Sequence, residues 1–244
     1  MKCIFCVTGK LGFKKDLTRE EIISQILFAN SYIKKRFGKK EDGSNRSVRN
    51  VVFMGMGEPL LNYENMRKSL EIMLQQDRLS LWRRHITIST CGIIPGIKKL
   101  IEDKVDVKLA ISLHAPNQEL RNQIMPIGKA FPLDELMTTI DEYVKATDNR
   151  IFYEYIMIKN MTDKPELAHQ LVKLLKGRLA HLNLIPYNEN PAIDLEESEK
   201  KSIQKFKEIL ENWGITVTVR DSMGREAKGA CGQLGYEKVS NSEQ

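Results

Sequence analysis

The sequence has little cysteine and no long hydrophobic run. Its 244 residues hold four cysteines, Cys3, Cys6, Cys91 and Cys231, which are too few and too scattered for a disulfide framework. No apolar run approaches the roughly 18 residues that a membrane-spanning helix needs. The first residues also lack the apolar stretch and small-residue cleavage site of a signal peptide. We therefore expect a cytoplasmic protein without a membrane segment, whose cysteines bind metal, act in catalysis or pack in the core.

Internal repeats, low-complexity tracts and linkers rich in proline or glycine are absent as well. With 41% hydrophobic and 29% charged residues the chain is not of the disordered class, so we expect one folded domain over residues 1–244. The net charge is modest, +6. Basic clusters at 34–36, 39–40 and 82–84, with Trp82 available to stack, allow a nucleic-acid partner without establishing one.

Short apolar runs alternate with longer segments of helical periodicity. Strands are expected at 51–54, 85–90, 107–112, 152–158, 182–185 and 216–220, and the apolar run 51–54 predicts a buried strand. Helices are expected at 18–38, 63–75, 95–102, near Gln118, and at 133–146, 163–175 and 197–213. In the first of these, apolar residues at helical spacing, among them Ile26 and Leu27, predict an apolar face. This alternation predicts a parallel sheet covered by helices. Glu58, Ser89, His114 and Asn188 fall at or just past strand ends, which favours a complete or partial (β/α) barrel over a doubly wound sheet.

Each candidate motif also has an ordinary structural interpretation. Cys3-Ile4-Phe5-Cys6 alone fits half a zinc site or a redox pair. The segment Gly55-Met56-Gly57-Glu58 lets a ligand approach the backbone and offers a carboxylate to an ammonium group, but it also fits a plain turn before a helix. His114 fits a turn residue as well as a ligand, and Cys91 fits the core. Cys231, among small residues with cations nearby, fits a reactive thiol or a buried cysteine of the tail.

Taken together, five segments resemble one family. Cys3-Ile4-Phe5-Cys6 is similar to the end of the cluster motif of radical S-adenosylmethionine enzymes, C-x-x-x-C-x-aromatic-C. The other four match, in order and spacing, the rRNA adenine methyltransferases of that class that act at carbon 2 or carbon 8. They are Gly55-Met56-Gly57-Glu58-Pro59, Ser112-Leu113-His114-Ala115, Asn183-Leu184-Ile185-Pro186-Tyr187-Asn188 and Ala230-Cys231-Gly232-Gln233-Leu234. The resemblance covers the chain from residue 1 to about Leu234.

The resemblance implies cofactors and residue roles. A [4Fe–4S] cluster would be held by three cysteines, of which Cys3 and Cys6 are the second and third, and S-adenosylmethionine would bind its open iron. Gly57 and Glu58 would take the methionine amino group, while Ser89, Ser112, Leu113, His114 and Asn188 would hold the rest of that cofactor. Cys231 would be methylated and would then pass its carbon to adenine through a radical. Large-subunit rRNA, tRNA as a further substrate and an electron donor are the implied partners of a monomeric enzyme.

The chain also departs from the family's pattern. The pattern puts the first cluster cysteine two residues before Met1, and a resolving cysteine, a glutamate base, the first barrel strand and an RNA-binding helical domain further upstream. The expected fold is therefore an incomplete barrel whose first strand is missing, from a fragment or a misassigned start. The segment Glu189-Asn190-Pro191 also differs from the family's turn. Carbon 2 is the expected target because it is the housekeeping activity; carbon 8 methylation, an inactive fragment and a radical enzyme with another substrate are the alternatives.

Overall fold

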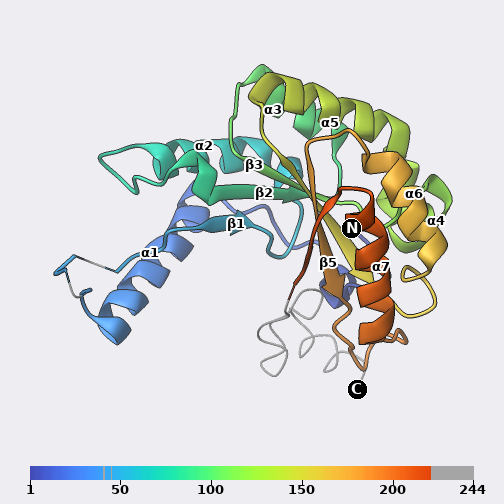
Figure 1. The fold of residues 1–244 in the computed structure, drawn as a ribbon. Coiled ribbons are helices and arrows are strands. Elements are labelled where there is room, and N and C mark those ends of the chain that lie inside the picture. Colours follow the sequence, from blue (N-terminus) through green and yellow to red (C-terminus); the bar gives the residue numbers. More distant parts are fainter. Residues whose placement is uncertain (41, 45, 221–244) are drawn as a thin grey trace.

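The computed structural model describes residues 1–40, 42–44 and 46–220, and its centre is one sheet of six parallel strands (Figure 1). The strands are β1 (Val51–Phe53), β2 (Ile86–Thr90), β3 (Lys108–Ser112), β4 (Ile151–Met157), β5 (Ala180–Pro186) and β6 (Thr216–Val219). Each strand pairs in parallel with the next strand in the sequence, in the order β1-β2-β3-β4-β5-β6.

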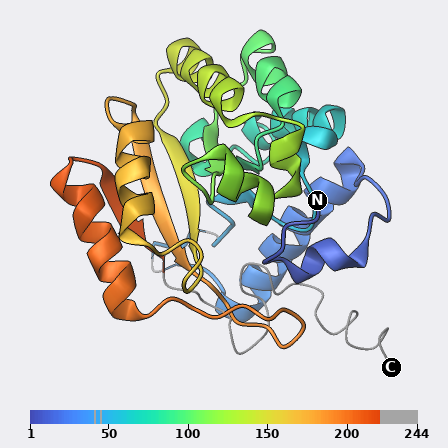
Figure 2. The same ribbon diagram turned by 90° about the vertical axis from the view of Figure 1, so that its right-hand side faces the viewer.

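Helices fill the connections between these strands. They are α1 (Arg19–Phe37), α2 (Tyr63–Leu74), α3 (Ile94–Glu102), α4 (Gln118–Ile124), α5 (Leu133–Thr147), α6 (Pro165–Leu175) and α7 (Lys200–Asn212). Parallel crossovers are right-handed, so a strand order that never reverses places every crossover helix on the same side of the sheet. Figures 1 and 2 show helices α2 to α7 wrapped around the outside of the curved sheet. A doubly wound sheet would reverse its strand order, so this fold is a partial barrel, as the sequence predicts.

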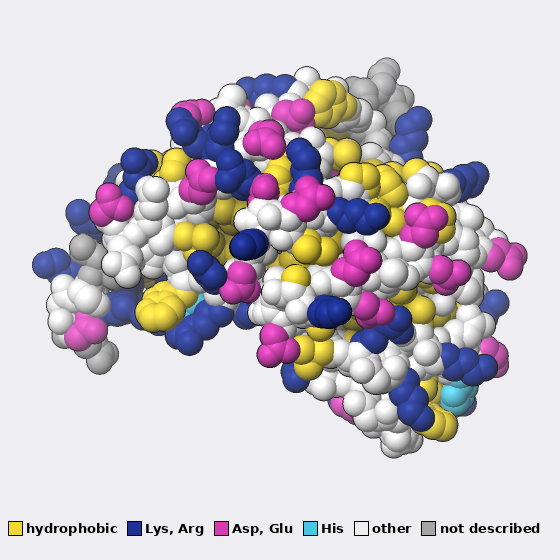
Figure 3. Space-filling view, turned by 90° about the horizontal axis from the view of Figure 1, so that it is seen from above, with side chains coloured by type: hydrophobic (Ala, Val, Ile, Leu, Met, Phe, Trp, Pro, Cys, Tyr) yellow, Lys and Arg dark blue, Asp and Glu magenta, His cyan; other side chains and the backbone are white. Residues whose placement is uncertain are grey.

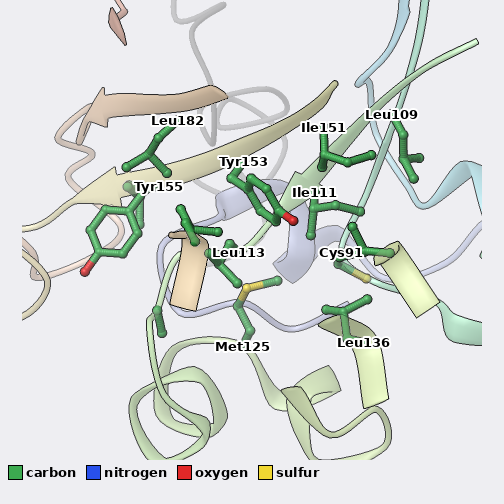
Figure 4. Packing of buried hydrophobic residues seen from close by; sticks show 14 of the residues in the cluster. Cys91, Leu109, Ile111, Leu113, Met125, Leu136, Ile151, Tyr153, Tyr155 and Leu182 are labelled. Atoms are coloured by element: carbon green, nitrogen blue, oxygen red, sulfur yellow. The ribbon is translucent and has the colours of Figure 1, made fainter. Parts of the chain in front are cut away.

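The hydrophobic core lies between the sheet and these outer helices. Along each strand every second side chain points outward, as the period of two requires. On β3 and β4 these outward residues are Leu109, Ile111, Tyr153 and Tyr155, all at most 1% exposed (Figure 4). The Tyr155 ring stacks on Phe206 of α7 at 5.3 Å. The core therefore fixes the strands from outside and leaves the inner face of the sheet free for other contacts.

The inner face is more polar. On β4 and β5, the Glu154 carboxylate accepts a hydrogen bond from Asn183, and the rings of Phe152 and His181 lie 5.3 Å apart. His181 also lies 2.8 Å from the Thr218 hydroxyl on β6. A face lined by such side chains suits a polar ligand better than it suits packing against a further hydrophobic layer.

The predicted elements are confirmed, with bounds that shift by one to three residues. The capping box at Thr18 and Glu21 begins α1, and the cap at Gly38 ends it. Two details are wrong. The strand at 51–54 was expected to be buried, but β1 is the edge of the described sheet and Val52 is 51% exposed. Leu27 was expected on an apolar face, yet it is 53% exposed because α1 packs chiefly on α2. Every helix of the described residues is too short or too polar to cross a bilayer.

Candidate functional site

The carboxyl ends of the parallel strands meet at one edge of the sheet, and the candidate residues gather there. Glu58 follows β1, Ser89 is the penultimate residue of β2, and the segment from Ser112 to His114 ends β3. Asn188 comes two residues after β5. Ser89 and Asn188 are buried, at 7% and 4% exposure. The register pairs Ser89 with Ala110 on β3 and Ser112 with Glu154 on β4, so these positions are neighbours across the sheet.

The N-terminal segment is anchored on this edge. Ile4 donates its backbone N–H to the carbonyl of Ile124 at the end of α4, at 3.1 Å. The Phe5 ring packs edge-on against His114 at 4.9 Å, and Val7 is fully buried. Gly9 permits the tight return of the chain, since a Cβ there would lie 2.9 Å from the Met1 carbonyl. These contacts hold the Cys3–Cys6 segment at the end of β3.

Two of the three described thiols belong to this segment. The Cys6 N–H donates to the Cys3 carbonyl at 3.2 Å, which folds the two cysteines into one turn. Burial, with repulsion from Cys6, raises the pKa of the Cys3 thiol to about 11. Burial and the Glu58 carboxylate raise the pKa of Cys91 as well. Such thiols stay protonated near neutral pH, so metal binding to Cys3 has to displace a proton.

The Glu58 carboxylate is held by two backbone donors. Its Oε2 accepts from the Cys91 N–H at 2.8 Å and its Oε1 accepts from the Leu60 N–H at 3.2 Å. Gly57, just before it, has a φ of +123°, which lets the chain turn from the strand into the short 3₁₀ helix Pro59–Leu61. The carboxylate thus has a fixed place between the ends of β1 and β2, and it is only half-buried. A cationic amino group can reach it.

Arg121 was missed by the sequence analysis, although it joins the turns after β2 and β3. Its side chain is fully buried. Nη1 donates to the carbonyls of Ser112 at 3.0 Å and Leu113 at 2.5 Å, and Nη2 donates to the carbonyl of Cys91 at 2.6 Å. Backbone carbonyl groups therefore stabilise the charge of this buried guanidinium, and no carboxylate of the described residues forms an ion pair with it. The sequence offers no clear signal, because Arg121 lies on a short helix of mostly polar residues.

Leu113 and His114 shape the turn after β3, Leu113 through its main chain and His114 through a hydrogen bond to β4. Leu113 is fully buried in the core (Figure 4), so only its main chain faces the strand-end site. His114 has a left-handed φ of +57°, and its Nδ1 accepts from the Ile156 N–H at 3.1 Å. Burial, with a smaller contribution from Arg121, lowers the pKa of His114 to about 3. The imidazole is therefore neutral at physiological pH.

We expect His114 to make stability depend on pH. Its folded pKa lies below that of the unfolded chain, so a proton is taken up on unfolding and stability falls between about pH 6.5 and pH 3. From about pH 7 to pH 5 the loss from this one group is about 2 kcal/mol. Asparagine tolerates the left-handed turn but does not titrate, so His114→Asn is the matched variant. Urea unfolding at both pH values tests this, and an equal pH dependence in the two proteins would contradict it.

Glu154 on the inner face is a second residue that the sequence analysis missed. It is 3% exposed, accepts from Asn183 Nδ2 at 2.9 Å and lies 3.4 Å from Arg220 Nη1. Burial raises the pKa of this carboxyl, and the bonds to Asn183 and Arg220 partly offset that effect. The signal was present, because Glu154 is the only charged residue of an otherwise apolar and aromatic strand. It lies beside Ser112, so it forms part of the wall of the strand-end site.

Most of the predicted site residues therefore share one end of the sheet. Cys3, Cys6, Gly57, Glu58, Ser89, Ser112, Leu113, His114 and Asn188 all lie on strand ends or on the segment anchored there. Cys231 lies outside the described residues. Thiols, a carboxylate and backbone groups around a half-open edge can bind a polar molecule that carries both an amino group and hydroxyl groups.

Comparison with known proteins identifies the family to which the chain is similar. The model of the radical SAM superfamily matches residues 1–172. The chain is 47% identical to the "Probable dual-specificity RNA methyltransferase RlmN" of Dictyoglomus turgidum, over 95% of this chain and 64% of that relative. It is 44% identical to the protein of the same printed name from Clostridium novyi, over 99% of this chain and 67% of that relative.

A solved structure agrees with these relatives. The chain superposes on a radical SAM methyltransferase from Sphaerobacter thermophilus with a TM-score of 0.90 and 37% identity, covering 96% of this chain and 66% of that one. The chain thus spans about two thirds of the length of the proteins that it matches.

Proposed function

Because the chain belongs to the radical S-adenosylmethionine superfamily and, within it, to the RlmN-type RNA methyltransferases, we propose that it forms the catalytic barrel of an RNA adenine methyltransferase. The proposed reaction places a methyl group on carbon 2 of adenine in large-subunit 23S rRNA, with tRNA as a further substrate. The proposed setting is the cytoplasm, with a monomeric enzyme and a separate electron donor.

One observation carries this proposal. The anchored Cys3–Cys6 segment, the fixed Glu58 carboxylate and the turn after β3 lie together at the carboxyl edge of a singly wound parallel sheet. Ligands of α/β sheets bind at this edge. The printed name of the relatives, dual-specificity RNA methyltransferase, supports RNA as the methylated molecule.

The family implies a [4Fe–4S] cluster and S-adenosylmethionine as cofactors. The described residues fit the cluster in part. Cys3 and Cys6 supply two thiols in one turn, but no group of three metal-ligating side chains lies together within residues 1–40, 42–44 and 46–220. Cys91 is buried and bonded through its backbone to Glu58 and Arg121, so it stays with the core. We therefore assign Cys3 and Cys6 as two cluster ligands and derive no step through the cluster.

The fit to S-adenosylmethionine is better. When bound, this sulfonium cofactor supplies the methyl carbon and, after reduction, the radical chemistry that an unreactive aromatic carbon needs. Glu58 is the proposed partner of its amino group, because a carboxylate that two N–H donors already fix can bind an ammonium without reorganising. Ser89, Ser112, the Leu113–His114 main chain and Asn188 are proposed to hold the remaining polar groups, with Gly57 leaving room at the backbone.

Cys231 is the proposed carrier of the methyl group before its transfer to adenine. An adenine ring carbon has no lone pair with which to attack a sulfonium directly, so an intermediate carrier on the protein is chemically reasonable. This role rests on the Ala230-Cys231-Gly232-Gln233-Leu234 motif.

Mass spectrometry of digested RNA tests the proposed reaction. The protein is expressed in cells that lack their own enzyme of this family, and large-subunit rRNA and tRNA are digested to nucleosides. We expect 2-methyladenosine with the unaltered protein and none with Cys231→Ala, while the matched variant Cys91→Ala keeps the product if it folds. Finding 8-methyladenosine without 2-methyladenosine would replace carbon 2 by carbon 8. An iron-loaded protein that makes neither product would support the alternative of an inactive fragment.

A further inference from the structure

A pocket lies at the opposite end of the sheet from the strand-end site. It is formed by residues 47–49, which lead into β1, and 79–82, which lead towards β2, together with Arg84 and His85. Its volume is about 390 Å³, within the range of small-ligand sites. We call it the amino-end pocket, because Val51 and Ile86 begin the two strands below it.

Hydrogen bonds to the neighbouring helices fix both walls of the amino-end pocket. The Val48 N–H donates to the side chain of Asn30 on α1 at 2.7 Å, and the Leu81 N–H donates to the carbonyl of Met73 on α2 at 2.8 Å. His85 bridges the walls: its Nδ1 lies 2.7 Å from Asn50 Oδ1, and its Nε2 accepts from Arg84 Nε at 3.3 Å. The pocket is thus part of the folded structure.

The chemistry of the pocket suits a nucleotide. Val48, Leu79 and Leu81 pack on the core and give it an apolar floor. Trp82 is 68% exposed at the rim, and the Arg84 guanidinium lies 5.1 Å from its ring centre. An exposed indole is a platform for stacking a nucleobase, and an adjacent arginine strengthens stacking and contacts phosphate.

The charge of the pocket points the same way. No carboxylate lines it. Within the part of the chain that the structure describes, no acidic side chain forms an ion pair with Arg49 or Arg84, whereas Arg83 pairs with Asp106 at 3.2 Å. Figure 3 shows Lys and Arg side chains beside hydrophobic ones at the left of the molecule, where the loops before β1 and β2 lie. Two arginines without acidic partners are available to an anionic ligand.

We propose that the amino-end pocket binds an unpaired nucleotide of RNA, with the base on Trp82 and phosphates on Arg49 and Arg84. This second contact rests on the proposed function, because the same RNA substrate would extend from the strand-end site past β1 to the amino-end pocket. The carboxylates of an acidic peptide could pair with Arg49 and Arg84, but they offer no flat ring to stack on the exposed Trp82 indole. RNA offers both phosphates and bases, so it is the better occupant.

Fluorescence tests this proposal directly. The chain has two tryptophans, so Trp213→Phe leaves Trp82 as its only indole. Titration with a single-stranded oligoribonucleotide of about eight nucleotides is expected to quench this fluorescence. The Kd of Trp82→Ala, measured by the fluorescence anisotropy of a dye-labelled oligoribonucleotide, is expected to be about tenfold higher, because one stacked base is lost. Arg49→Ala with Arg84→Ala is expected to reduce the slope of log K against log salt by about 1.4, because each phosphate contact of a single strand contributes about 0.7.

A matched pair at the C-terminal ends of α6 and α7 supplies the control. Lys176 Nζ lies 4.9 Å from the ring centre of Trp213, which is 52% exposed, so the pair repeats the cation-on-indole arrangement away from the pocket. Trp213→Ala with Lys176→Ala is expected to leave the Kd unchanged. Equal Kd values for Trp82→Ala and this control would overturn the proposal. A polyglutamate peptide that binds as tightly as RNA, without dependence on Trp82, would also overturn it.

The readouts separate this proposal from the proposed function. RNA methylation with unchanged RNA affinity in Trp82→Ala would overturn the second contact and leave the methyltransferase intact. Quenching of Trp82 by RNA without any methyladenosine from the unaltered protein would support the second contact and count against the methyltransferase.

Discussion

Replacing Arg121 by methionine is expected to lower the free energy of unfolding by about 3 kcal/mol. Methionine fills much of the same space, so the main change is the loss of the donors. The buried carbonyls of Cys91, Ser112 and Leu113 would then lose their shared partner. Each unsatisfied buried acceptor costs about 1–3 kcal/mol, and relief from burying the guanidinium charge offsets part of the sum. Urea unfolding monitored by circular dichroism measures the difference.

Arg178 offers a matched control for this variant. It also makes several hydrogen bonds, but its partner Asp141 is at the surface, at 2.9 Å, where solvent screens the pair. Arg178→Met is therefore expected to cost about 1 kcal/mol or less. If the free energy of unfolding falls by the same amount in both variants, the buried network does not stabilise the protein more than the surface pair does. Arg121→Lys, which keeps the charge but not the fork of donors, is expected to fall between the two.

Replacing Glu58 by glutamine is expected to weaken S-adenosylmethionine binding by about 10- to 100-fold, which corresponds to about 1.5–3 kcal/mol. The loss has two sources. Glutamine has no negative charge for the amino group of the cofactor, and its NH₂ would face one of the N–H donors, Cys91 or Leu60, that now bond to a carboxylate oxygen. Equilibrium dialysis of the iron-loaded protein against labelled S-adenosylmethionine measures the affinity.

Glu64→Gln is the matched control for this experiment. Glu64 lies in the first turn of α2, a few residues after Glu58, and its exposed carboxylate is 3.6 Å from Lys99. The same change there is expected to leave the affinity for S-adenosylmethionine unaltered. Equal affinities for the unaltered protein and Glu58→Gln would remove Glu58 from the proposed cofactor site.

Periodicity in the sequence predicts the order and type of the elements well. Pro165 at the start of α6 and the capping box at Thr18 are local signals. The Thr18 side chain accepts a hydrogen bond from a free N–H of the first turn, and proline has no N–H that would need a partner there. Burial is less local. Val52 reads as a buried strand residue, yet it is half exposed because β1 has no neighbour on its outer side among the described residues.

The candidate site divides in the same way. Glu58 and His114 could be found because strand ends are visible in the sequence, and the parallel sheet brings strand ends together. Arg121 could not, since an arginine on a short helix is normally a surface residue. Only its position above the ends of β2 and β3 turns it into the donor that holds both.

The sequence by itself determined a chain of alternating strands and helices, the family motifs and the residues for a site at the strand ends. These follow from short-range patterns, because helix and strand periods and motif spacings are written in neighbouring residues. Only the tertiary structure decided that the strand order never reverses, that His114 is a neutral turn residue held by Ile156, and that Trp82 and Arg84 border a pocket with Arg49. Each of these depends on contacts between segments far apart in the sequence, and folding alone brings such segments together.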